Sequence, residues 1–147
     1  MKSRKKQSVG ERMKEIELEA IIDNIPKLTS FVEEFAEAVE CPAKVMVHLD
    51  VAIDEIFSNI AHYAYPDEAG KVWVSVDCLD NPKRIELRFE DEGIRYNPLE
   101  KEDPDIKLSA EERQIGGLGI FIVKKSMDAM EYSYEDGKNI LTIVKNY

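Results

Sequence analysis

The sequence predicts one α+β domain, with two long helices in its first half and antiparallel strand pairs in much of the rest. Apolar residues recur at three- and four-residue steps in residues 27–39 and 42–64, the spacing of helices with one buried face. Apolar and polar residues alternate in residues 72–76 and 85–89, and again near the end of the chain, which is typical of hairpin strands. A length of 147 residues suits a single domain with one core.

The composition argues against two kinds of partner. The formal net charge of -10 would repel a phosphodiester backbone, so we expect no direct contact with nucleic acid. No apolar run approaches the roughly 20 residues that a membrane-spanning helix needs, so no membrane partner is expected.

The amino-terminal segment, residues 1–12, is basic and lacks the apolar core of a signal peptide. We interpret it as a disordered arm, which leaves residues 13–147 for the domain and predicts a cytoplasmic protein. In that compartment the two thiols, Cys41 and Cys78, are expected to be reduced packing residues.

One strand and two helices are predicted in the first half of the chain. Apolar residues alternate with glutamates in residues 15–20, as in a short edge strand. The first helix, residues 27–39, follows Pro26, a residue that fits the first turn of a helix. The second, residues 42–64, ends before Pro66. Its predicted buried stripe consists of Val45, Leu49, Ala52, Ile53, Ile56 and Ile60.

Two hairpins, a long loop and a short helix are predicted in the second half. The central strands flank a turn at Asn81-Pro82. Residues 94–115 form a loop of a length that is usually either disordered or functional in a compact domain, and we interpret it as a lid. A short apolar helix follows at residues 120–127, and the closing hairpin turns at Asp136-Gly137.

Glu55 and Asn59 are the first candidate site residues. They are four residues apart and therefore share one face of the second predicted helix. The carboxylate could accept a proton, and the amide oxygen suits a hard cation such as magnesium. An isolated pair of this kind usually belongs to a solvated helix face, so its interpretation as a site depends on the elements around it.

Asp91 and Gly93 form the second candidate element. Asp91 ends a predicted strand, and Gly93 follows in a turn where the backbone can approach a flat ligand. The carboxylate could accept a hydrogen bond from an amino group such as that of adenine. An ordinary turn has the same local sequence.

The third candidate element is the glycine-rich segment Gly116, Gly117, Leu118 and Gly119, which is predicted to precede the short helix. Free backbone amides and the positive end of the helix dipole could meet phosphate oxygens there. The segment is not a P-loop, because Ile120 follows the last glycine. Arg113 is a candidate cation for a terminal phosphate, or a solvated side chain.

Together, the three elements resemble the ATP-binding superfamily that includes gyrase, a class of heat-shock chaperones, the histidine kinases and the MutL proteins. The resemblance covers about residues 15–147 and implies the Bergerat fold, a two-layer sandwich with a mixed, mostly antiparallel sheet covered on one face by helices. The chain is most similar to the bacterial anti-sigma factor serine/threonine kinases, through the segments DEIFSNIAHYAYP and GGLGIFIVKKSMD.

This resemblance implies ATP and Mg²⁺ as cofactors and a role for each matching residue. The roles are general base for Glu55, magnesium ligand for Asn59, adenine recognition for Asp91, turn glycine for Gly93, and phosphate-loop glycines for Gly117 and Gly119. Arg95 departs from the family pattern, because many relatives have a second glycine there. The backbone at Arg95 must therefore adopt a conformation that is open to larger residues.

The resemblance implies a serine/threonine protein kinase that acts as an anti-sigma factor, with Glu55 accepting the proton of the substrate hydroxyl. The implied phosphoacceptor is an anti-anti-sigma protein, the sequestered partner is a sigma factor, and a homodimer is expected. Two alternatives stay open: an ATP-gated binding module without kinase activity, and a slow ATPase. His62 is predicted to be structural, and the aromatic residues predicted to pack, not to stack on a base, are Phe57, Tyr63, Tyr65 and Trp73.

Overall fold

The computed structural model describes residues 13–100 and 117–147 of the chain. Its elements, in order, are β1 (Lys14–Glu19), the 3-10 turn η1 (Ile22–Asn24), α2 (Ile25–Ala38), α3 (Ala43–Tyr63), β2 (Lys71–Leu79), β3 (Arg84–Asp91), the 3-10 turn η2 (Pro98–Glu100), α4 (Gly117–Ser126), β4 (Ala129–Glu135) and β5 (Lys138–Asn146). Most of the predicted lid, together with Arg113 and Gly116, lies outside the described residues.

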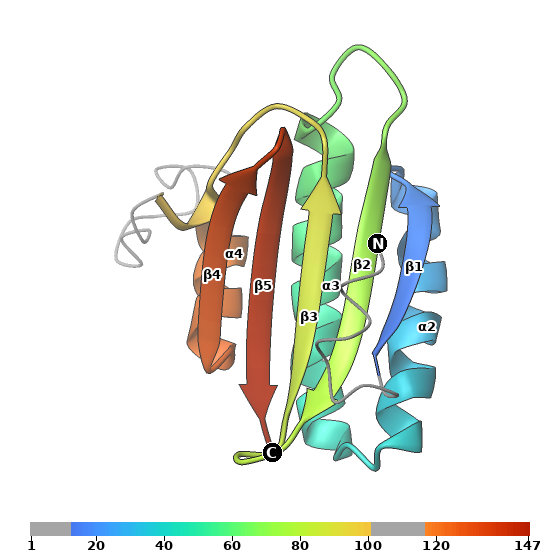
Figure 1. Ribbon diagram of the computed structural model, residues 1–147, viewed down its shortest axis with the longest axis vertical. Helices are drawn as coiled ribbons and strands as arrows, with labels where there is room; N and C mark the ends of the chain where they lie inside the picture. The colour runs from blue at the N-terminus through green and yellow to red at the C-terminus, as the bar shows by residue number, and fades with distance from the viewer. Residues whose placement is uncertain (1–12, 101–116) are drawn as a thin grey trace.

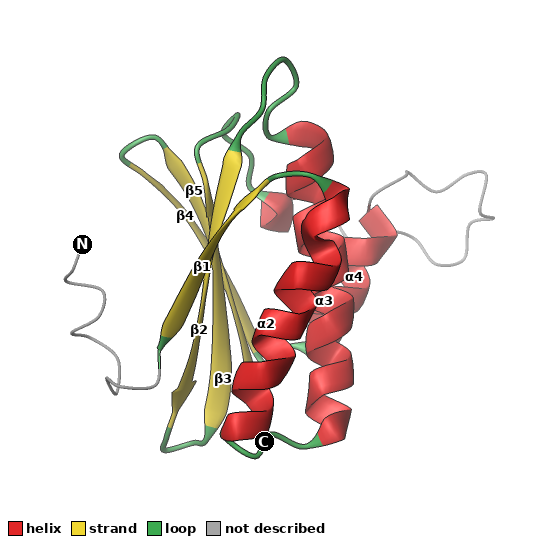
Figure 2. Ribbon diagram, turned by 90° about the vertical axis from the view of Figure 1, so that its right-hand side faces the viewer, coloured by secondary structure: helices red, strands yellow, loops and turns green. Residues whose placement is uncertain are grey.

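The described chain forms two layers, a five-stranded sheet and a layer of helices on one of its faces (Figures 1 and 2). The strand order is β1-β2-β3-β5-β4, and all four neighbouring pairs are antiparallel. β1 and β4 are therefore the edge strands. This architecture confirms the α+β, two-layer fold class that the sequence predicts.

The core lies between the sheet and the helices. Alternate residues of β2 and β3 point toward the helices and are fully or almost fully buried, as the two-residue period requires. The principal members are Val72, Val74, Val76, Ile85, Leu87 and Phe89 from the sheet, and Leu49, Ala52, Ile53 and Phe57 from α3. The predicted stripe of α3 is correct except at its end, where Phe57 is completely buried and Ile60 is only partly buried.

Helices α2 and α3 are joined by a tight connection. Pro26 stands in the first turn of α2, as expected. The helix ends where Glu40 adopts a left-handed φ of 60°, and the amide of Cys41 donates back to the carbonyl of Ala36 over 2.9 Å. The short link lets the two helices pack side by side on the sheet.

Helix α4 begins earlier than the sequence predicts. Gly117, Leu118 and Gly119 form its first turn and do not precede it as a loop. Glycine runs normally indicate a loop because of their low helix propensity, but the start of this helix passes so close to α3 that glycine is required at position 119. Met127, expected in the helix, follows it and still donates its amide to Val123.

The β2–β3 turn lies at one end of the sheet, and the segment that follows β3 lies at the other (Figure 1). The guanidinium of Arg84 closes the turn by donating to the carbonyls of Asp80, at 3.1 Å, and Pro82, at 2.8 Å. The Tyr147 amide donates to the Lys83 carbonyl over 3.0 Å, so the end of the described chain lies beside this turn.

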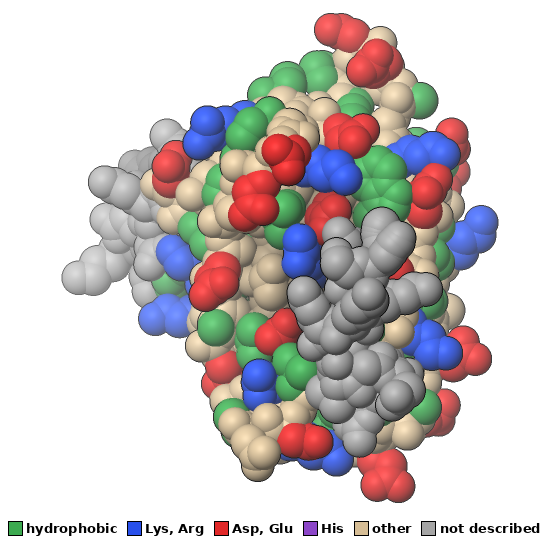
Figure 3. Space-filling view, in the orientation of Figure 1, with side chains coloured by type: hydrophobic (Ala, Val, Ile, Leu, Met, Phe, Trp, Pro, Cys, Tyr) green, Lys and Arg blue, Asp and Glu red, His purple; other side chains and the backbone are tan. Residues whose placement is uncertain are grey.

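The face of the sheet opposite the helices carries charged side chains, and acidic and basic groups are interspersed over its visible part (Figure 3). Trp73 lies on this face, half-buried, and donates from Nε1 to Glu17 over 3.0 Å. Lys71 contacts the same carboxylate at 2.7 Å. Trp73 thus packs within a charged surface, in agreement with the sequence.

The remaining aromatic predictions are mixed. Phe57 is a core residue, and the Tyr65 hydroxyl donates to the Lys71 carbonyl over 2.6 Å, so both pack as expected. Tyr63 is largely exposed and is not a core residue, so for this side chain only packing at an interface stays a prediction. Both cysteines are free thiols. In residues 13–100 and 117–147, no helix has the length and apolar character needed to cross a membrane.

Candidate functional site

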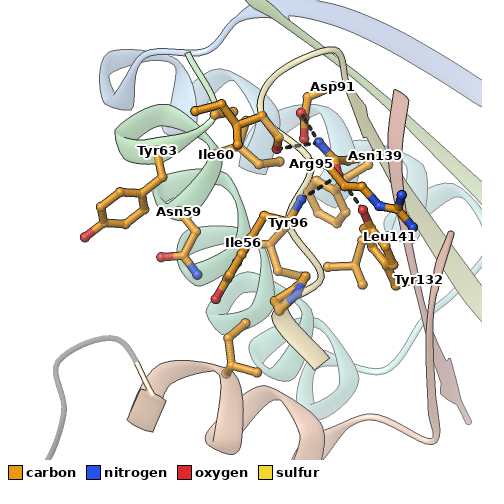
Figure 4. Close-up of a pocket in the computed structure, with 15 residues that line it drawn as sticks. Ile56, Asn59, Ile60, Tyr63, Asp91, Arg95, Tyr96, Tyr132, Asn139 and Leu141 are labelled. Carbon is orange, nitrogen blue, oxygen red and sulfur yellow. Dashed lines mark hydrogen bonds between the residues drawn. The ribbon is translucent and has the colours of Figure 1, made fainter. Parts of the chain in front are cut away.

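A cavity of about 190 Å³ lies between the C-terminal half of α3 and the sheet, at the end where β3 finishes and β5 starts. Its floor is apolar and is formed by Ile56, Ile60, Phe89, Ile120 and Leu141. Polar side chains stand around it: Figure 4 shows Asn59 and Tyr63 extending from α3, across from Asp91, Arg95, Tyr132 and Asn139 on the sheet side. An apolar cavity with a few convergent polar groups is the usual form of a small-molecule site.

Glu55 and Asn59 are neighbours on α3, as their spacing predicts. The amide Nδ2 of Asn59 donates to Oε2 of Glu55 over 3.2 Å. This bond uses the nitrogen of the amide, so the Asn59 oxygen is left as an acceptor or a cation ligand. Asn59 lines the cavity, and Glu55, to which it donates, lies at its border and is not itself a lining residue.

Gly119 brings α4 against Glu55. A methyl group at position 119 would overlap the Glu55 carboxylate, so glycine here leaves that carboxylate free to lie against the start of α4. The glycine-rich segment and the carboxylate on α3 therefore lie together in the structure, although 64 residues separate them in the chain. The first turn of a helix offers unpaired backbone amides, which suits an anion near this carboxylate.

Asp91 is the last residue of β3, and its side chain is buried. The amide of Gly93 donates to Asp91 Oδ1 over 2.9 Å, which closes the turn. A Cβ atom at position 93 would overlap the Ala64 carbonyl, and the next amide, of Ile94, donates to that carbonyl over 2.9 Å. Gly93 is needed because the turn packs directly on the end of α3.

The environment of Asp91 has opposing effects on its ionisation. Burial raises the pKa of the Asp91 carboxyl above its ordinary value, while hydrogen bonds donated by Asn139 and Gly93 act to lower it. The charged form is thus held in a largely dry site by two fixed donors. An ionised carboxylate only accepts hydrogen bonds, which suits a ligand amino group.

Asn139 is a site residue that the sequence analysis missed. Its side chain is buried, lines the cavity and donates to Asp91 Oδ1 over 2.9 Å. One signal was present, because strand alternation places Asn139 in phase with the inward-facing Leu141 and Ile143. A polar residue at an inward position needs a buried hydrogen-bond partner.

Arg95 occupies its position without backbone strain. Among the described residues, the non-glycine residues with positive φ are Glu40, Asn81 and Asp136, so Arg95 lies outside that region, as expected from its large side chain. Its guanidinium carbon stands 4.8 Å from the centre of the Tyr134 ring. The segment after Gly93 therefore accommodates an arginine by directing its side chain onto β4.

Of the remaining predicted site residues, Gly117 and Leu118 fall within the described chain. Arg113 and Gly116 lie outside the described residues, and Gly117 and Leu118 are placed only as the backbone that begins α4. His62 is exposed near the end of α3 and stands 5.9 Å from the Tyr63 ring, outside the cavity lining, which agrees with a structural role.

The fold and this arrangement of α3, the β3 turn and the start of α4 define the class to which the protein belongs. Residues 18–145 match the family described as the histidine kinase-like ATPase domain, and the chain belongs to this family.

Similar proteins within this family are named as protein kinases. The chain is 25% identical over 117 residues to serine/threonine-protein kinase BtrW of Bordetella bronchiseptica. The aligned residues make up 79% of this chain and 81% of that protein. It is 27% identical over 97 residues to serine-protein kinase RsbW of Bacillus thuringiensis and of Bacillus anthracis. Those matches cover 63% of this chain and 59% of each RsbW, so the chain spans less than two thirds of the RsbW proteins.

Proposed function

We propose that this chain is an ATP-dependent serine/threonine protein kinase that acts as an anti-sigma factor. The observation that carries the proposal is the position of Glu55, which stands beside Asn59 and against the first turn of α4, at the border of a cavity whose other side holds Asp91. In this proposal, a proton acceptor (Glu55), a cation ligand (Asn59) and a carboxylate that would bind the purine amino group (Asp91) surround one site.

In this proposal an adenine ring occupies the apolar cavity, with its amino group toward Asp91. The triphosphate extends toward the start of α4, where the backbone amides of Gly117, Leu118 and Gly119 lie. The largely apolar lining of the cavity supports an aromatic base in this position.

A magnesium ion fits this site only together with phosphate oxygens. The described residues contain no group of three His, Cys, Asp or Glu side chains that could hold a metal alone. Asn59 would supply a neutral oxygen, as is usual for magnesium bound between a protein and a nucleotide. When bound, the ion would neutralise charge on the phosphoryl group that is transferred.

Glu55 is the proposed general base. Its carboxylate would accept the proton of a serine or threonine hydroxyl as the oxygen attacks the phosphoryl group. The hydrogen bond from Asn59 fixes the side chain on one edge. Arg113, Gly116 and a lid at residues 94–115 belong to the proposal as phosphate-binding and covering elements, and residues 1–12 as a disordered arm.

The proposed partners are those that the sequence resemblance implies. An anti-anti-sigma protein would be the phosphoacceptor, a sigma factor would be the sequestered partner, and the active unit would be a homodimer in the cytoplasm. The relatives are named as serine or serine/threonine kinases, which supports a hydroxyl acceptor.

The test has a binding step and a transfer step. Calorimetric titration with ATP and magnesium should show binding by the wild type, and Asp91→Asn should weaken it by about tenfold or more, since a hydrogen bond to a charged group is lost. Asn146→Ala serves as a matched control, because Asn146 is exposed at the far end of β5. Absence of binding by the wild type would refute the ATP site.

Transfer is then measured with labelled ATP and purified anti-anti-sigma proteins of the same organism. The wild type should label one of them on a serine or threonine, and Glu55→Gln should bind ATP normally and label none. Equal labelling by Glu55→Gln would remove Glu55 as the base. ATP-dependent binding of a partner without any labelling would favour the ATP-gated binding module instead.

A further inference from the structure

The side chain of Asn139 forms four hydrogen bonds within the site. Its Nδ2 donates to Asp91 Oδ1 at 2.9 Å and to the Ile94 carbonyl at 3.0 Å. Its Oδ1 accepts from the Tyr96 amide at 3.0 Å and from the Tyr132 hydroxyl at 2.5 Å. The side chain connects β3, the segment after it, and β4, and only 6% of the residue is exposed.

These four bonds use the full capacity of the amide and allow only one orientation. A primary amide has two N–H donors on nitrogen and two acceptor sites on oxygen. The Tyr96 backbone amide can only donate, so the Asn139 oxygen must face it. The nitrogen must then face Asp91. The pairing of Asn139 with Asp91 across β3 and β5 places the two side chains for this contact.

The fixed amide also decides which oxygen of Asp91 is left for a ligand. Oδ1 of Asp91 accepts from both Asn139 and Gly93. Neither bond uses Oδ2, and Asp91 lines the cavity. The carboxylate is therefore held with one oxygen engaged by the protein and one available.

We propose that Asn139 is the positioning residue for base selection: by holding Oδ1 of Asp91 it presents Oδ2 to the 6-amino group of an adenine nucleotide. The proposal rests on the ATP site proposed above. It adds the element that gives the site its preference for a 6-amino purine. A purine without that amino group gains nothing from Asp91, because an ionised carboxylate cannot donate to it.

Asn139 also maintains the charge on Asp91. Its donated hydrogen bond lowers the pKa of a carboxyl that burial raises, so its removal should shift protonation of Asp91 to higher pH. The other ionisable groups facing Asp91 are Tyr65, Tyr132 and Glu92, with Arg95 beside Tyr132. Burial raises the pKa of both tyrosines, so they stay neutral across the range in which Asp91 titrates.

The test compares two nucleotides in the whole chain. Dissociation constants are measured for magnesium complexes of ATP and of purine riboside triphosphate, which lacks the 6-amino group. The wild type should prefer ATP by about tenfold or more. In Asn139→Ala the ratio of the two dissociation constants should fall toward one, mainly because the affinity for ATP decreases. As the pH is lowered, the variant should also lose ATP affinity at a higher pH than the wild type, because Asp91 becomes protonated earlier without the bond from Asn139. Asn146→Ala should retain the wild-type ratio and pH profile.

Two results would overturn the proposal. An unchanged preference in a folded Asn139→Ala variant would show that Asn139 only packs, and a wild type that binds both nucleotides equally would show that Asp91 does not select the base. The second result is distinct from failure of the ATP site, in which the wild type binds neither. If Asn139→Ala does not fold, Asn139→Asp keeps the shape of the side chain but replaces the Nδ2 donor to Asp91 Oδ1 with an oxygen, and it should lower the preference in the same direction; no change there would equally refute the proposal.

Discussion

Two glycines near the site, Gly93 and Gly119, are required by different neighbours. At Gly119 the neighbour is the end of a flexible side chain, the carboxylate of Glu55. At Gly93 it is backbone, the carbonyl of Ala64, which cannot move without shifting the end of α3. The same substitution should therefore affect activity at one position and stability at the other.

Gly119→Ala should leave the fold intact and reduce phosphoryl transfer. The new methyl group displaces the Glu55 carboxylate, while alanine in place of glycine inside a helix gains up to about 1 kcal/mol of helix propensity. We expect an unchanged or higher melting temperature, retained ATP binding and a lower transfer rate. The matched variant Gly93→Ala should instead lose about 1–3 kcal/mol of stability through overpacking. Wild-type transfer by Gly119→Ala would contradict the role of this contact.

The residues that carry the candidate site differ in how far local sequence reveals them. Glu55 with Asn59, and Asp91 with Gly93, are pairs within four residues, so helix and turn geometry predicts their proximity. The contact of Gly119 with Glu55 and the bond of Asn139 to Asp91 join distant parts of the chain. These depend on the packing of α4 on α3 and on the β3–β5 register, which single-sequence periodicity does not specify.

At the scale of elements, the packing of α2 on α3 brings two acidic side chains together. Asp50 on α3 and Glu33 on α2 are hydrogen-bonded carboxyl groups, and Asp50 Oδ1 is buried without a partner. Burial, with the charge and hydrogen bond of Glu33, raises the pKa of Asp50 from 3.8 to about 6. The neutral form of Asp50 is therefore favoured at this helix contact.

This carboxyl pair predicts that stability falls as pH rises. The pKa of Asp50 is 3.8 in the unfolded chain and about 6 in the folded state, so the folded state holds this proton more tightly. Its contribution to the free energy of unfolding is therefore complete below about pH 3.8 and lost as the pH rises through about 6. Asp50→Asn should raise stability near neutral pH and flatten the dependence between about pH 4 and 7. Urea unfolding across this range measures it, with the exposed Asp54→Asn as control. Parallel profiles for wild type and Asp50→Asn would exclude the effect.

The elements themselves are predicted best where a pattern is long. Both long helices lie within two residues of their expected positions, and both hairpins are present with strand ends within three residues, because a long helical or alternating pattern leaves little freedom. The start of α4 was wrong because three glycines in four residues oppose helix by propensity. Tertiary contact with α3 overrides that preference, and it cannot be seen from the local sequence.

At the scale of the whole molecule, the cavity joins elements from both halves of the chain. Helix α3 forms one wall, the ends of β3 and β5 form the other, and Ile120 of α4 contributes to the floor. A ligand in this cavity would therefore connect α4 and the segment after β3 to the central helix. Strand β1 and helix α2 contribute no residue to its lining.

Nucleotide binding should accordingly protect one end of the molecule from amide hydrogen exchange. With ATP and magnesium at about 100 times the dissociation constant, the folded state gains about 2.7 kcal/mol. Local protection beyond this global gain should appear in α4 and in residues 92–100, and not in β1 or α2. Asp91→Asn, with a dissociation constant about tenfold higher, should gain only about 1.4 kcal/mol at the same concentration and show correspondingly less of this protection. Equal extra protection across all helices would indicate that the ligand binds elsewhere.

The tight β2–β3 turn at the opposite end of the sheet has a practical consequence. Residues Asp80, Asn81, Pro82 and Lys83 are exposed, and β3 separates them from the cavity by its full length of eight residues, about 25 Å in an extended strand. A fluorophore or surface tether attached there would stand clear of the proposed nucleotide site. The protein could thus be immobilised or labelled at this turn, and its partners identified by capture, with the cavity open to solution.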